Sequence, residues 1–133
     1  MLARVAQRVL EAYNRRDLDL VALFSDPEFE YRPGRDWVDG GLVDASYRGM
    51  SGYRRYVANA DQVWAGQNWL TPRELVDLGD RLLILADGDM RAQGSGVPLS
   101  QEFALLCTLK RGLTITAQEY YDHAEALRVV GLS

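Results

Sequence analysis

The residues that could carry chemistry gather near the end of the chain, in the stretch EYYDHAEALRVVGL at positions 119–132. This stretch holds the single histidine, His123, and three carboxylates close to it, Glu119, Asp122 and Glu125. Carboxylates beside a histidine can serve acid–base catalysis or metal binding, and they can equally begin a helix. A zinc site needs three or four ligands in a recognisable spacing, which one histidine and one distant cysteine do not supply. We therefore expect no metal site.

The spacing of Asp122 and Glu125 predicts the start of a helix. An acceptor at the N-cap, a glutamate three positions later and an apolar stretch after it form the pattern of a capping box. Gly131 can then end the helix. The capping role does not exclude catalysis by Asp122, because a cap residue at the corner between a strand and a helix can also face a cavity.

Glu119 is the carboxylate that we expect to be more deeply buried. Strand alternation places it on the same face as Ile115 and Ala117. A buried carboxylate needs a hydrogen-bonding partner. We therefore predict that Glu119 points into a cavity, within reach of Arg91, a tyrosine or His123.

The elements that must position these residues follow from the hydrophobic periodicity. We expect an amphipathic first helix, a short second helix capped by Asp17, a strand in DPEFEYRPG, a Gly/Asp-rich loop and a helix from Ser51 to Gly66. After Gly66 the period changes to two, which predicts four antiparallel strands joined by short turns. Their expected ranges are 69–78, 81–93, 97–110 and 113–121.

Composition excludes several classes of function. The 133 residues correspond to one globular domain with 47% apolar residues and a net charge of −4. No basic cluster is longer than two residues, so we expect no nucleic-acid partner. No apolar run is long enough for a membrane span, and the N-terminal stretch lacks the apolar core of a signal peptide, which favours a cytoplasmic location. No glycine-rich phosphate loop is present, and we expect no cofactor.

Five segments together resemble the SnoaL-like family of the nuclear-transport-factor-2-like (NTF2-like) superfamily. They are EAYNRRDLDLVALF, YRGMSGYRRY, LVDLGDRLLIL, GSGVPLSQEFALLCTLKRG and EYYDHAEALRVVGL, and they cover nearly the whole chain in order. The resemblance implies a single domain over residues 1–133. Its implied fold is a cystatin-like α+β barrel, a cone-shaped curved antiparallel sheet wrapped around helices. The resemblance also implies a deep pocket for a hydrophobic small molecule and a homodimer formed through the sheet.

The pocket candidates are mostly aromatic, with plain core packing as the alternative for each. Trp37 differs from the others because it lies in the Gly/Asp-rich loop, where it could act as a lid or as a surface anchor. The candidates are Tyr13, Trp37, Tyr53, Trp64, Phe103, Tyr121 and His123.

The resemblance also implies which carboxylates could be catalytic. Asp122 matches the acid–base carboxylate that SnoaL-type polyketide cyclases carry near the end of the last strand, with Glu119 close by. The three positions that ketosteroid isomerase needs fall at Val9, Arg32 and Leu105. None of these side chains can do the required work, so we expect a different mechanism.

Limonene epoxide hydrolase, a third relative, uses an Asp–Arg–Asp set. Asp87, Asp89 and Arg91 lie on one face of a predicted strand, and Asp89 with Glu119 matches two members of that set. The arginine position carries Asp87 instead, and Arg91 lies on the other side of Asp89. An Asp89, Arg91 and Glu119 site could polarise water or an oxyanion. The alternative is a ladder of salt bridges at the rim of the sheet.

Two hypotheses therefore remain open. The first is a cyclase, isomerase or hydrolase that acts on a hydrophobic, oxygen-bearing molecule, with Glu119 or Asp122 as its acid–base residue. The second is a non-catalytic ligand-binding or dimerisation domain.

Overall fold

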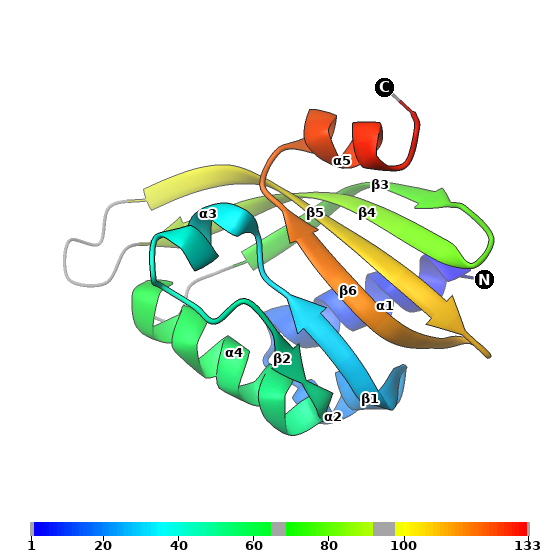
Figure 1. The fold of residues 1–133 in the computed structure, drawn as a ribbon, viewed down its shortest axis with the longest axis horizontal. Coiled ribbons are helices and arrows are strands. Elements are labelled where there is room, and N and C mark those ends of the chain that lie inside the picture. The colour runs from blue at the N-terminus through cyan, green and yellow to red at the C-terminus, as the bar shows by residue number, and fades with distance from the viewer. Residues whose placement is uncertain (1, 65–68, 92–97, 133) are drawn as a thin grey trace.

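The computed structural model describes residues 2–64, 69–91 and 98–132. The described chain is an α+β structure in which one curved sheet packs against helices (Figure 1). Its helices are α1 (Leu2–Asn14), α2 (Leu18–Ala22), α3 (Arg35–Asp39), α4 (Gly49–Trp64) and α5 (His123–Val129). Its strands are β1 (Ser25–Arg32), β2 (Tyr47–Arg48), β3 (Trp69–Asp77), β4 (Arg81–Arg91), β5 (Pro98–Lys110) and β6 (Leu113–Tyr120). None of the helices in these ranges is long and apolar enough to cross a membrane.

The strand order β2-β1-β6-β5-β4-β3 corrects two details of the expected barrel. The sheet is mixed rather than antiparallel, because β1 runs parallel to β6, with Tyr31 opposite Ala117. Parallel neighbours need a long crossover, and here the chain between β1 and β6 passes through α4 and the β3–β5 meander. The sheet is also not closed, since β2 and β3 form its two edges.

The two faces of the sheet are covered by different helices. On the inner face, Leu82 and Ile84 of β4 belong to the main core, together with residues of α1, α2 and α4. On the outer face, Leu83 and Leu85 pack with Ala126 of α5. In Figure 1, α1 passes behind the strands and α5 lies above the sheet. The first half of β4 is therefore apolar on both faces.

Local signals in the sequence position the ends of several elements as expected. The Asp17 carboxylate accepts a hydrogen bond from the Leu20 backbone N–H and caps α2. At the other end of the chain, α5 ends in a Schellman motif around Gly131, whose φ is +81°. The Gly/Asp-rich loop contains more structure than its composition indicated, because it includes α3 and the short strand β2.

Candidate functional site

The site is built around Glu119, whose side chain is 1% exposed and is the one buried charged group among the described residues. Its Oε2 accepts hydrogen bonds from the hydroxyls of Tyr31 and Tyr56, the latter at 2.5 Å. Its Oε1 accepts from the Tyr121 hydroxyl at 2.6 Å and from the Gly34 N–H at 3.2 Å. A carboxylate has about four acceptor positions. The four donors therefore fill the hydrogen-bonding capacity of Glu119.

Three of these four donors come from distant parts of the chain, and the fourth, Tyr121, follows Glu119 by two residues. Tyr31 lies on β1, directly beside β6, which carries Glu119 two residues beyond Ala117. Tyr56 reaches the carboxylate from α4, which lies over β1. Gly34 follows β1 and caps the start of α3. The parallel pairing of β1 with β6 thus brings Tyr31 and Gly34 to the carboxylate, and the packing of α4 over β1 adds Tyr56.

Gly34 is required by the close approach of the Tyr121 ring. A Cβ atom at this position would lie 2.2 Å from Tyr121 Cε2, well inside van der Waals contact. The Gly34 N–H also donates to the Tyr121 hydroxyl at 3.1 Å. Trp37 of α3 covers this corner, with its ring centroid 4.9 Å from that of Tyr121.

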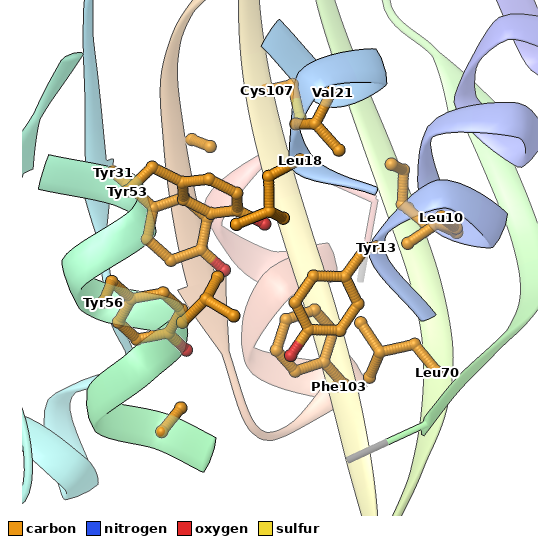
Figure 2. Close-up of a cluster of buried hydrophobic side chains, with 14 of the residues drawn as sticks. Leu10, Tyr13, Leu18, Val21, Tyr31, Tyr53, Tyr56, Leu70, Phe103 and Cys107 are labelled. Atoms are coloured by element: carbon orange, nitrogen blue, oxygen red, sulfur yellow. The ribbon is translucent and has the colours of Figure 1, made fainter. Parts of the chain in front are cut away.

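The inner side of Glu119 faces an aromatic cluster. The ring of Tyr31 lies 4.6 Å from that of Tyr56 and 5.0 Å from that of Tyr53, measured between centroids. Figure 2 shows these tyrosines gathered on one side of the interior, with Tyr13 of α1 and Phe103 of β5 on the other. The Tyr53 side chain is 6% exposed, and its hydroxyl makes no hydrogen bond to any other described residue.

Two small cavities lie in this interior. One of about 40 Å³ is lined by Glu119 and by Tyr13, Tyr31, Tyr53, Tyr56 and Phe103, with apolar side chains completing the wall. It has room for about one or two water molecules. The other, of about 80 Å³, is lined mainly by apolar side chains and by Cys107, and Val9, Leu10 and Leu105 border both cavities. The deep pocket that the resemblance implied is thus largely filled by tyrosine side chains.

Burial dominates the electrostatics of the site. Removal from water raises the pKa of Glu119 above its ordinary value, and the hydrogen bonds from Tyr121, Tyr31, Tyr56 and Gly34 oppose that rise. Burial likewise raises the pKa of the Cys107 thiol to about 12. Both effects favour the neutral form. Chemically, the arrangement offers a carboxyl group that can hold or release a proton, with tyrosine hydroxyls that stabilise its charged form.

The structure does not bring Asp89 and Arg91 to Glu119. Both lie on β4 in phase with Leu83 and Leu85, on the outer face, whereas Glu119 faces the inner cavity. A joint Asp89, Arg91 and Glu119 site is therefore wrong for this fold. The same outer face carries a salt bridge between Asp87 and Arg73, with 2.5 Å from Nε to Oδ2. This contact fits the alternative of surface salt bridges.

Asp122 and His123 also have structural contacts away from the inner cavity. The Asp122 carboxylate accepts from the Ala124 backbone N–H at 2.9 Å and caps α5. The His123 Nε2 lies 2.8 Å from the carbonyl oxygen of Ala86 and 3.0 Å from that of Phe103, which requires a proton on Nε2. Asp122 borders a polar surface groove of about 330 Å³. Glu119 and Tyr121 of the site also border this groove, whose other lining residues are Arg35, Asp36, Gln118, Tyr120 and Glu125.

Of the predicted aromatic residues, Tyr13, Tyr53 and Phe103 line the cavity beside Glu119. Tyr121 and Trp37 lie on the other side of the carboxylate, and the side chain of Trp64 is outside the described part of the structure. The sequence analysis did not select Tyr31 and Tyr56, although two patterns point to them. Tyr31 alternates with the buried Phe29, and Tyr56 follows Tyr53 by one helical turn.

Comparisons with known proteins agree with the fold. No protein-family model matches the sequence, and no curated protein matches it. An NTF2-like protein of unknown function from Burkholderia pseudomallei superposes with a TM-score of 0.81 at 21% identity, covering 98% of this chain and 97% of that one. TerC, co-crystallised with polyporic acid, matches with a TM-score of 0.80 at 18% identity and 97% coverage of both chains.

A third match is a protein from Jannaschia sp. CCS1 proposed to be a SnoaL-like polyketide cyclase. Its TM-score is 0.75 at 13% identity, covering 99% of this chain and 92% of that chain. The protein thus has the NTF2-like fold, with SnoaL-like proteins among its structural relatives, as the resemblance implied. Fold alone does not fix function, which must be argued from the site.

Proposed function

We propose that the protein binds a small, largely apolar molecule with one polar group in the interior beneath the sheet. The observation that carries this proposal is Glu119, a fully buried carboxyl at the wall of an aromatic cavity. Buried polar groups weaken a core unless they are fully paired. The Tyr53 hydroxyl, which has no hydrogen-bonding partner among the described residues, is difficult to explain by packing alone, and a ligand would give it a partner.

Catalysis by Glu119 is the second candidate, and the raised pKa of this carboxyl favours it. A general base with a pKa moved toward working pH could enolise an oxygen-bearing substrate, as in a cyclase or isomerase. The filled acceptor positions oppose this role in the present arrangement, because a base needs a free lone pair. One tyrosine hydroxyl would have to turn away before Glu119 could accept a proton. We therefore rank ligand binding first.

Native mass spectrometry of the purified protein tests whether it retains a small molecule. A second test works without the natural ligand and follows amide NMR shifts during titration with 1-butanol. We expect saturable shifts at Glu119 and Leu105, which line the interior cavities. The variant Val9→Phe adds volume to the wall shared by both cavities and should abolish these shifts. The control variant Asp89→Asn, on the outer face, should leave the shifts unchanged. An interior binding site would be refuted if the shifts were confined to surface residues and native mass spectrometry showed no retained small molecule.

A further inference from the structure

The direction of the hydrogen bonds around Glu119 determines what the cavity can offer a ligand. Each tyrosine hydroxyl has one proton to donate. Tyr31 and Tyr56 both direct that proton to Glu119 Oε2, and both line the inner cavity. Their hydroxyl oxygens keep lone pairs that can only accept. Toward the cavity, this pair of tyrosines therefore presents hydrogen-bond acceptors.

The described side chains that line the inner cavity include Glu119 but no basic residue. When Glu119 is ionised, it is a buried charge, and none of the described residues that line the cavity is a lysine or arginine. Arg16, which lies over the ring of Tyr13, is paired with Asp61 at 2.7 Å. No group of three metal-binding side chains is found among the described residues. Buried charges in proteins are normally paired or bound to metal. Arg35 lines the surface groove that Glu119 also borders, and on the cavity side a cationic ligand would supply the opposite charge.

The aromatic wall suits a cation as well. Four tyrosines and a phenylalanine surround the space, and aromatic faces attract positive charge, most strongly where water is excluded. The Tyr53 hydroxyl, buried and without a partner among the described residues, is available to an N–H donor. The second cavity shares Val9, Leu10 and Leu105 with this one and is lined mainly by apolar side chains, which suit an alkyl chain.

We propose that the interior site selects a small primary ammonium compound with a short alkyl chain. The ammonium group would lie beside Glu119 and Tyr53, and the alkyl chain would extend toward Cys107. This inference rests on the proposed function and gives it a ligand class. A site that polarises a ketone must donate hydrogen bonds to its oxygen. Tyr31 and Tyr56 donate to Glu119 instead, so we expect this site to prefer an ammonium to a ketone.

The test compares three probes of matched size, n-butylammonium, 1-butanol and 2-butanone, by NMR titration at pH 8. We expect the ammonium to bind about tenfold or more tightly than the alcohol, and the ketone to bind most weakly. Binding of the alcohol or ketone as tightly as the ammonium overturns the ammonium preference and leaves the proposed function intact. Absence of interior shifts with all three probes overturns both proposals.

Two further measurements assign the effect to Glu119. In Glu119→Gln the affinity for n-butylammonium should fall to that for 1-butanol, while Tyr53→Phe should weaken binding of the ammonium and retain its preference over the ketone. If Glu119→Gln does not fold, the wild type still provides the test. Its affinity for the ammonium should rise with pH as Glu119 ionises, and its affinity for 1-butanol should stay constant. An affinity for the ammonium that stays constant over the pH range in which Glu119 ionises would refute a role for the carboxylate.

Discussion

Tyr53 and Tyr56 provide a matched pair for testing the network around Glu119. Both tyrosines lie on α4, both are at most 6% exposed, and both belong to the same aromatic cluster. They differ in what their hydroxyls contact. Tyr56 donates to Glu119 Oε2 at 2.5 Å, and Tyr53 donates to no other described residue. Replacing each with phenylalanine removes one hydroxyl and keeps the ring.

The expected magnitudes follow from that difference. A hydrogen bond to a charged group stabilises a protein by about 1.5–3 kcal/mol. At a pH where Glu119 is ionised, Tyr56→Phe should therefore lower the free energy of unfolding by about 2 kcal/mol, since the ring contact with Tyr31 at 4.6 Å persists. Tyr53→Phe removes a buried hydroxyl without a described partner. It should leave the stability unchanged or raise it by up to about 1 kcal/mol.

Urea unfolding followed by circular dichroism measures both effects. With a slope of about 2 kcal/mol per molar urea, Tyr56→Phe should lower the midpoint by about 1 M. The Tyr56 hydrogen bond lowers the pKa of Glu119 and so favours its ionised form. The cost of Tyr56→Phe should consequently shrink as pH falls and Glu119 becomes protonated. Equal losses for the two variants, or a loss for Tyr56→Phe that does not depend on pH, would refute the reasoning.

Three further predictions concern Glu119 and its surroundings. Because burial raises the folded-state pKa of Glu119 above the ordinary value near 4.5, ionisation of this carboxyl lowers the free energy of unfolding. The wild type should therefore lose stability relative to Glu119→Gln as pH rises from about 4.5 through that pKa. Parallel pH profiles of stability for the two proteins would contradict this prediction. Gly34→Ala places a Cβ 2.2 Å from the Tyr121 ring and should cost about 1–3 kcal/mol in urea unfolding; Tyr121→Ala in the same chain should recover part of that loss if the clash is its cause. Asp122→Ala removes the N-cap bond to Ala124 and should cost about 1 kcal/mol without changing 1-butanol binding, and a loss of binding would indicate a role for Asp122 in the site.

The sequence by itself determined most of the local structure. Alternation of apolar residues predicted β3–β6 to within a few residues at each end, because a strand with one buried face repeats every two residues. The caps at Asp17 and Asp122 were predictable, since they depend on neighbours only two or three positions away. The burial of Glu119 was predictable from strand alternation, because Ala117 lies two positions earlier on the same strand face and is also buried.

The tertiary structure alone decided which faces meet. Asp89 and Arg91 continue the face of Leu83 and Leu85, which is apolar because α5 covers it from outside. The continuous apolar run at the start of β4 indicates that both faces are buried, and it does not show which face encloses the cavity. In the same way, Tyr31 and Glu119 are 88 positions apart and meet through the parallel pairing of β1 with β6. Spacing within one element reports which residues share a face, whereas the partner of that face is set by packing between elements that are distant in the chain.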